Sequence, residues 1–553
     1  MFDSSRVESS TGRWSIPIGL FLGSLLLVAA TLKDYGITWD EPAYFHASDL
    51  QNQWLVEFGE NLLRFDLGKS LQDENIKKAW HWDPYHVPHP PFSRIVSGIT
   101  KATFAPYVDK FVAYRLGPAL FFALLVTCIY VWMRDLFDEA TGLFSALALL
   151  VIPNLFGFAH IAVTDIALAA MWFFTVYCFS RGLDNWRWSI VLGLVWGLAL
   201  ATKFPALMLP VPLLLWAHLY LRADYRNNLF SMIFLGPLVA VASQPYMWHQ
   251  PGLRFLEFLY EGISRGYRPE TNFSIFFLNK IYYTATLPWY YPFFIVGITT
   301  PEVILALALL GALLIPWLKA QRGTMLLFLI NALFLVCLAL APGAVLHDGV
   351  RQLLSALPFL AGLAGGGFYL LFNWLVSACQ RASALRGVQH IKAKVAAATL
   401  IFLLFPPLLD VWLCHPFELS YYNHLVGGIR GAYARGLEVT YFMEALTPGF
   451  LRSLNAKLPP NSVINASTAN FMFAYYQKEG RLRPDIKMTD TGPFNYYILL
   501  NRRSILSARQ QLLLNGTTQP YLSVGIAGVP LVAVFEINRP GQRPSSYAHA
   551  DRK

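Results

Sequence analysis

Residues 14–42 read WSIPIGLFLGSLLLVAATLKDYGITWDEP, an apolar run followed closely by two adjacent acids. The apolar part, Trp14 to Leu32, approaches the ~20 residues with which a helix crosses a bilayer. Because no small-residue cleavage site precedes Lys33-Asp34-Tyr35, the run predicts a retained membrane anchor and not a cleaved signal peptide.

The two acids, Asp40 and Glu41, lie between the aromatic residues Trp39 and Tyr44. Trp and Tyr are typical of the headgroup zone of a membrane. A carboxylate at that depth is partly removed from water, which raises its pKa and makes it a usable proton acceptor. The alternative interpretation is that both acids are solvated surface residues at the end of a helix.

Composition places the chain among integral membrane proteins. Of 553 residues, 55% are hydrophobic and 14% are charged, whereas soluble domains carry about 25% charge; the mean hydropathy is +0.43. The net charge is +10, but the basic residues are scattered over short loops, which favours membrane topology over nucleic-acid binding. The five cysteines form no CxxC pair and predict neither disulfides nor a zinc site. The sequence therefore predicts no cofactor, and it leaves a divalent-metal requirement open.

Apolar runs predict about eleven spans, near 14–32, 111–133, 142–160, 162–180, 188–203, 205–221, 229–247, 296–318, 324–341, 353–376 and 396–415. Lys and Arg gather at loop ends on the side of the N-terminus, which puts that side in the cytoplasm and the loop 33–110 outside. Prolines interrupt 288–318, and two spans there would move the C-terminal part inside. We expect a transmembrane domain (1–415) with an external catalytic loop (33–110), a soluble α/β domain (416–538) and a disordered tail (539–553).

Within the C-terminal part, Thr447 to Leu458 predicts a helix capped by Thr447 with Pro448 at its first position. Strands are expected at Ser462–Asn465, Tyr496–Leu500 and Tyr521–Ile537.

The outer ends of the spans carry an unusual number of ionisable residues, and such residues at membrane depth are functional hypotheses by default. They occur in the stretches His86–Arg94, Tyr114-Arg115-Leu116, Thr164-Asp165, Ala201–Pro205 and His347–Gln352. Other interpretations remain: arginines can reach to lipid headgroups, and Asp165 can cap a helix. Glycines 193, 197 and 365–367 indicate close helix packing.

This pattern suits group transfer from a lipid-linked phosphate. Arg and Lys would stabilise the anionic phosphate leaving group, and a carboxylate would deprotonate the acceptor hydroxyl. A transporter is the alternative from another class, because intramembrane charges also mark ion paths; against it, the charges gather at one face and no inverted repeat is found.

The motifs together resemble the C-type (GT-C) glycosyltransferase fold, in the branch of the protein O-mannosyltransferases and aminoarabinose lipid A transferases. The resemblance covers most of residues 33–376. Asp40-Glu41 is similar to that branch's acidic pair, in which the Asp is the catalytic base, and Tyr114-Arg115-Leu116 resembles its phosphate-contacting arginine. Further similar stretches are His89-Pro90-Pro91, Thr164-Asp165, Gly197 to Lys203, Pro288 to Pro301 and Tyr421 to Gly428, the last shared with uncharacterised bacterial members.

The chain also departs from the family. Arg94 stands where the mannosyltransferases usually have Lys, and His89 where the aminoarabinose enzymes have Lys. There is no room for the β-trefoil domain of the eukaryotic mannosyltransferases.

The resemblance implies an all-α polytopic GT-C membrane protein with about eleven transmembrane helices and a small C-terminal α/β domain. It implies an inverting glycosyltransferase in a bacterial inner membrane, active on the extracytoplasmic face; protein O-mannosylation is one candidate reaction, and transfer to a lipid or polysaccharide is the alternative. The implied partners are a polyprenyl-phosphate sugar, a protein, lipid or glycan acceptor and membrane lipids. The implied site residues are Asp40 and Glu41 (catalytic), Arg94, Arg115, Lys203 and Arg351 (donor phosphate), and His89, Asp165, His347 and Asp348 (substrate).

Overall fold

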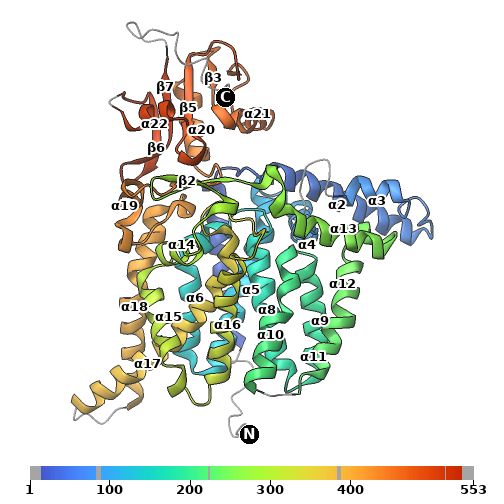
Figure 1. Ribbon diagram of the computed structural model, residues 1–553, viewed down its shortest axis with the longest axis vertical. Coiled ribbons are helices and arrows are strands. Elements are labelled where there is room, and N and C mark those ends of the chain that lie inside the picture. Colours follow the sequence, from blue (N-terminus) through green and yellow to red (C-terminus); the bar gives the residue numbers. More distant parts are fainter. Residues whose placement is uncertain (1–13, 82–88, 222–223, 383–387, 517, 538–553) are drawn as a thin grey trace.

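A computed structural model describes residues 14–81, 89–221, 224–382, 388–516 and 518–537. The expected tail 539–553 and the residues His86–Pro88 lie outside these ranges. The described chain is mostly helical, with a small sheet in its C-terminal part (Figure 1).

Helices form the body of the molecule, and most of the long ones run roughly parallel (Figure 1). The helices of the body are α1 (Ser15–Thr31), α5 (Lys110–Leu136), α6 (Glu139–Leu150), α7 (Pro153–Phe158), α8 (Asp165–Gly182), α9 (Trp186–Leu200), α10 (Pro210–Leu215), α11 (Arg226–Phe230), α12 (Gly236–Ala242), α14 (Tyr291–Thr299), α15 (Glu302–Leu313), α16 (Arg322–Leu338), α17 (Leu357–Ala382) and α18 (Val388–Cys414).

Four of the described helical segments are long and apolar enough to cross a membrane, namely Ser15–Asp34, Lys110–Leu136, Arg351–Arg381 and Lys392–Cys414. Five shorter apolar helices accompany them, and α14 with α15 forms a fifth crossing if the pair is one span. An integral membrane protein follows from these segments, while the total of about eleven spans remains a prediction.

The proline-interrupted stretch 288–318 is a sharp corner. Helices α14 and α15 meet at Thr300-Pro301 with a bend of 119°. Pro301 lacks the N–H that would continue α14 and disfavours helical geometry at Thr300, so the chain turns there.

Close helix packing occurs where the glycines predict it. A Cβ at Gly197 would lie 2.5 Å from the Gly236 carbonyl oxygen, and one at Gly367 would meet the Leu307 carbonyl. Side chains larger than hydrogen would therefore push α9 from α12, and α17 from α15.

The predicted loop 33–110 is largely helical, with α2 (Glu41–Leu63), α3 (Asp73–Trp80) and α4 (Phe92–Phe104). Helices α2, α3 and α13 (Pro251–Ser264) lie across one end of the bundle (Figure 1). An ion pair between Asp73 and Arg254 joins α3 to α13, so the first loop is attached to the loop that follows α12.

The C-terminal part carries a five-stranded mixed sheet, in the order β4-β3-β5-β7-β6. Its strands are β3 (Val463–Asn465), β4 (Lys487–Met488), β5 (Tyr496–Leu500), β6 (Leu522–Ile526) and β7 (Val529–Glu536); its helices are α20 (Pro448–Lys457), α21 (Asn470–Lys478) and α22 (Ala508–Asn515), with α19 (Gly428–Ala434) before them. The remaining strands, β1 (Ser274–Phe277) and β2 (Lys280–Tyr283), form a separate hairpin.

The predicted strand 521–537 is a hairpin, β6 and β7, that turns at Ala527-Gly528. The Thr447 cap is confirmed, since its side chain accepts a hydrogen bond from the Phe450 amide. This part of the chain lies on the first loop: the Trp39 amide donates to the Phe442 carbonyl (3.1 Å), and the Ile37 amide donates to the Tyr476 hydroxyl (2.7 Å). Both contacts lie within three residues before Asp40.

Candidate active site

A chain of ion pairs joins four of the predicted site residues. Arg351 donates to Asp40 Oδ2 (2.6 Å) through Nη2 and to Asp165 Oδ2 (3.1 Å) through Nε. Lys203 Nζ donates to Asp165 Oδ1 (2.8 Å) and to the Gln352 side chain (3.1 Å). The Asp40 side chain is 31% exposed and that of Asp165 only 1%. Of these two acids, Asp40 is therefore the one that a substrate can reach.

Local structure explains these positions. Asp40 precedes the first turn of α2, and Asp165 is the first residue of α8. Lys203 lies between α9 and a 3₁₀ turn that begins at Phe204. The alternative role of Asp165 as a side-chain cap is not realised, since the start of α8 has no capping side chain.

The loop before Arg351 adds a second charged group. His347 Nδ1 donates to Asp348 Oδ2 (2.6 Å), and Arg351 Nη1 donates to the same oxygen (3.1 Å). Arg502, from the C-terminal part, lies 3.3 Å from Asp348 Oδ1. Burial would raise the pKa of Asp348, but the neighbouring His347, Arg502 and Arg351 hold it below its ordinary value. Asp348 is therefore a fixed anion that orients the cations around it.

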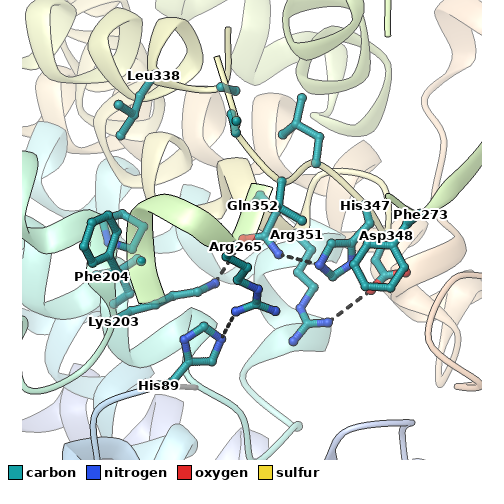
Figure 2. Close-up of a pocket in the computed structure, with 18 of the residues that line it drawn as sticks. His89, Lys203, Phe204, Arg265, Phe273, Leu338, His347, Asp348, Arg351 and Gln352 are labelled. Carbon is teal, nitrogen blue, oxygen red and sulfur yellow. Dashed lines mark hydrogen bonds and ion pairs between the residues drawn. The ribbon is translucent and has the colours of Figure 1, made fainter. Parts of the chain in front are cut away.

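His89 faces a cation that belongs to none of the sequence motifs. Arg265, just after α13, lies 3.3 Å from His89 Nε2 (Figure 2). Burial lowers the pKa of His89 far below its ordinary value, and Arg265 and Lys203 lower it further. His89 is thus a neutral ring between basic groups, able to donate or accept a hydrogen bond.

Arg94 lies behind this group. Its side chain is buried, with Nε 3.4 Å from Gln51 Oε1, and burial lowers its pKa to about 10. Its Nη1 has no hydrogen-bond partner in the described structure, but Arg94 does not line the cavity described below. Direct contact with a donor phosphate, as predicted for Arg94, requires a rearrangement.

Arg115 and Glu41, predicted to bind the donor phosphate and to act in catalysis, form a separate, fully buried pair. Arg115 Nε and Nη2 donate to the two oxygens of Glu41 (2.7 and 2.6 Å). The other Arg115 donors bond the carbonyls of Leu32, Tyr35 and Gly36. Because every N–H of Arg115 is used, this guanidinium holds the first loop, and phosphate binding by Arg115 would require some of these bonds to break.

The Glu41 carboxylate likewise makes its hydrogen bonds within the protein. It also accepts bonds from the Thr38 amide and hydroxyl and from the Ala162 amide, and it is 0% exposed. Glu41 therefore fixes the backbone around Asp40.

One cavity of about 610 Å³ connects the charged residues with an apolar wall. Its charged end includes Asp40, His89, Lys203, Arg265, His347, Asp348, Arg351 and Arg502. Its apolar part includes Leu168, Leu207, Met208, Leu335, Leu338 and Pro342; Leu338 lies well away from the charged end in Figure 2. Four cations line the cavity, Lys203, Arg265, Arg351 and Arg502, together with three carboxylates, Asp40, Asp348 and Glu261. Glu261 is paired with Arg268 outside the lining, and Asp165 pairs with Lys203 and Arg351.

The structure therefore defines a helical membrane protein with a cavity that is cationic at one end and apolar at the other. Residues 89–248 match the family described as dolichyl-phosphate-mannose-protein mannosyltransferase. The matched range is less than a third of the chain, begins at His89 and contains Arg115, Asp165 and Lys203. Over this range the match confirms the resemblance that the motifs indicate.

Among solved structures, the chain is similar to ArnT from Cupriavidus metallidurans bound to undecaprenyl phosphate, at 16% identity and a TM-score of 0.45, with 95% of this chain and 98% of that chain covered. An oligosaccharyltransferase from Archaeoglobus fulgidus in its apo form has 12% identity and a TM-score of 0.44, covering 73% and 56%. AglB from the same organism, in complex with an inhibitory peptide and a dolichol-phosphate, has 10% identity and a TM-score of 0.43, covering 88% and 69%. No curated protein matches the chain.

Proposed function

We propose that the protein is an inverting GT-C glycosyltransferase that moves a sugar from a polyprenyl-phosphate donor to an acceptor hydroxyl. The observation that carries this proposal is the two-part cavity: a cationic end for a phosphate, continuous with an apolar wall for a prenyl chain. Charge-assisted bonds suit the phosphate, and the apolar wall offers the prenyl chain surroundings as apolar as the bilayer from which it comes.

Asp40 is the proposed base. It would take the proton of the acceptor hydroxyl as that oxygen attacks the anomeric carbon of the donor sugar. The bond between this carbon and the phosphate oxygen breaks, and polyprenyl phosphate leaves with the bonding electrons. Arg351 and Lys203, with Arg265 across the cavity, would stabilise the charge on the departing phosphate.

The acceptor would enter between the first loop and the C-terminal part, where Trp39, Thr468 and Arg502 border the cavity. The positive-inside bias supports placing this mouth on the extracytoplasmic side. The name of the matched family makes mannose and a protein hydroxyl the first pair to test; a lipid or polysaccharide acceptor is the alternative.

The test is transfer by the purified protein. Radiolabelled polyprenyl-phosphate sugars are incubated with candidate acceptors, and the labelled product is identified; Asp40→Asn is the inactive control. We expect label to pass to an acceptor and polyprenyl phosphate to be released. Ion-gradient-dependent uptake of a soluble solute by vesicles, with no binding of polyprenyl phosphate, would instead establish a transporter.

A further inference from the structure

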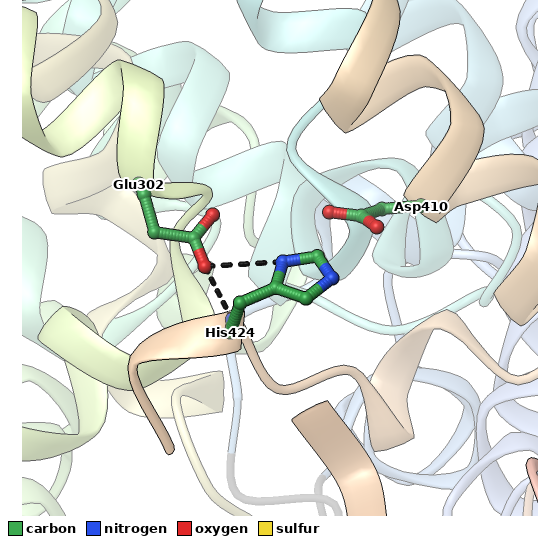
Figure 3. A group of neighbouring side chains, drawn as sticks. All are labelled: Glu302, Asp410 and His424. Atoms are coloured by element: carbon green, nitrogen blue, oxygen red, sulfur yellow. Dashed lines mark hydrogen bonds and ion pairs between the residues drawn. The ribbon is translucent and has the colours of Figure 1, made fainter. Parts of the chain in front are cut away.

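Three ligand-type side chains from distant parts of the sequence converge outside the cavity. Glu302 is the first residue of α15, Asp410 lies near the end of α18, and His424 begins a 3₁₀ turn on the way to the C-terminal part. One potential ligand atom from each lies within 4.8 Å of the other two, and Figure 3 shows the His424 ring between the two carboxylates. None of the three lines the charged cavity.

The charges of this group are unbalanced. Two carboxylates share a single basic partner, since His424 Nδ1 lies 3.2 Å from Glu302 Oε1 and the described ion pairs give neither Glu302 nor Asp410 a Lys or Arg. Like-charged carboxylates at this distance repel each other unless a proton or a cation lies between them.

Neighbouring bonds hold the group in place. The Tyr421 hydroxyl donates to Asp410 Oδ2 (2.9 Å). The Asn423 side-chain amide donates to the carbonyls of Gly297 (2.7 Å) and Thr300 (2.8 Å), which fixes the segment of His424 against the corner between α14 and α15. Outer-sphere bonds of this kind orient ligands in metal sites.

We propose that Glu302, Asp410 and His424 bind a divalent transition-metal ion of the Zn²⁺ type. One imidazole nitrogen and two carboxylate oxygens are accepted zinc ligands and leave a fourth position for water. The imidazole disfavours Mg²⁺ and Ca²⁺, which prefer oxygen ligands. The His424 side chain is 73% exposed, so an ion can enter without rearrangement of the fold.

The ion would join three parts of the chain: the start of α15, the end of α18 and the segment that leads to the C-terminal part. It would also account for two stretches that the cavity leaves unexplained, namely Thr300-Pro301 with the following Glu302, and Tyr421 to Gly428. Its role is structural, and it does not depend on the proposed glycosyl transfer.

The test measures Zn²⁺ binding to EDTA-stripped, purified protein by titration calorimetry, with Mg²⁺ as the comparison ion. We expect saturable Zn²⁺ binding that His424→Ala and Glu302→Gln each weaken by at least ~10-fold. His218→Ala, which removes an exposed histidine elsewhere, should bind Zn²⁺ as the wild type does. Absence of saturable binding, or equal affinity in wild type and His424→Ala, overturns the proposal.

Thermal unfolding supplies a second measurement. Zn²⁺ should raise the melting temperature of the wild type and leave that of His424→Ala unchanged, while the two proteins melt together without metal because the ring is largely exposed. Co²⁺ should give the visible absorption of a nitrogen- and oxygen-coordinated ion in the wild type and not in His424→Ala. Loss of Zn²⁺ binding with sugar transfer intact refutes only the metal site, and the reverse result refutes only the proposed function.

Discussion

Replacing Arg115 tests whether this residue holds the fold or the donor. Arg115→Ala removes both bonds to Glu41 and three bonds to backbone carbonyls. The carboxylate left behind is 0% exposed, so it keeps a buried charge without a cation. Breaking a buried pair in this way costs about 3–5 kcal/mol, a large part of the ~5–15 kcal/mol that stabilises a typical protein.

The assay is thermal unfolding in detergent, with Arg181→Ala as the matched control. The Arg181–Asp135 pair is 31% and 23% exposed, so its loss should cost no more than ~1 kcal/mol. Arg115→Ala should lower the melting temperature strongly, whereas Arg181→Ala should change it little.

A double variant separates folding from binding. Glu41→Gln with Arg115→Met replaces the charged pair by an uncharged one. Such a replacement often changes the stability of a protein little. The recovered protein should bind polyprenyl phosphate as the wild type does. If Arg115→Ala keeps wild-type stability and loses only donor binding, our structural role for this pair is wrong and Arg115 returns to the phosphate site.

Three further predictions concern the cavity and its surroundings. Asp40→Asn should lower turnover ~10²–10⁴-fold while binding of the labelled donor persists; normal turnover would move the base to Asp165. Lys203→Ala and Arg351→Ala should each weaken polyprenyl-phosphate binding by ~1.5–3 kcal/mol, measured by titration, with free sugar failing to compete. Burial raises the pKa of Glu438 from 4.5 to about 7. The folded state then holds more protons than the unfolded state between these values, so this group's contribution to stability falls as pH rises from 4.5 to 7; melting curves of Glu438→Gln should lack that part of the pH dependence, and an unchanged profile would contradict it.

The local parts of the fold could be predicted from the sequence. The Thr447 cap and the strand Tyr496–Leu500 are found where the sequence predicts them. A capping side chain, a proline and a run of strand-forming residues each act within a few positions. The helices of the first loop were not predicted, since α2 and α3 are too polar to be recognised by apolar runs. Strand β4, Lys487–Met488, is too short to carry a pattern and is defined only by its partner β3.

In the candidate site too, local features could be predicted from the sequence, and contacts between distant residues could not. Asp40, Asp165, Lys203 and Arg351 come together because each ends an apolar segment on one side of the bundle, which the sequence does reveal. The partner of Lys203 could not be deduced, because Asp165 is 38 positions away, and the partner of Arg115 is 74 positions away. Pairing across such separations depends on how the helices pack.

Two further cations of the cavity lie far from the ends of the apolar runs. Arg265 follows α13 and Arg502 follows β5, so only their place in the folded chain brings them to the cavity. Arg265 and Arg268 are two of the four Lys and Arg residues between the seventh and eighth predicted spans, so the sequence offers no signal that selects Arg265.

Arg351 links the proposed base to the proposed phosphate site. Its guanidinium contacts Asp40, Asp165 and Asp348 and lies 4.1 Å from the ring centre of Phe442. Asp165 and Asp348 are 1% and 6% exposed, whereas Asp40 is 31% exposed, so the bond to Asp40 is the one for which water can most readily substitute. Under the proposed function, a donor phosphate that draws Arg351 toward itself would weaken this bond and free the Asp40 carboxylate. The base would then be available only once the donor is bound, because the same cation serves both groups in turn.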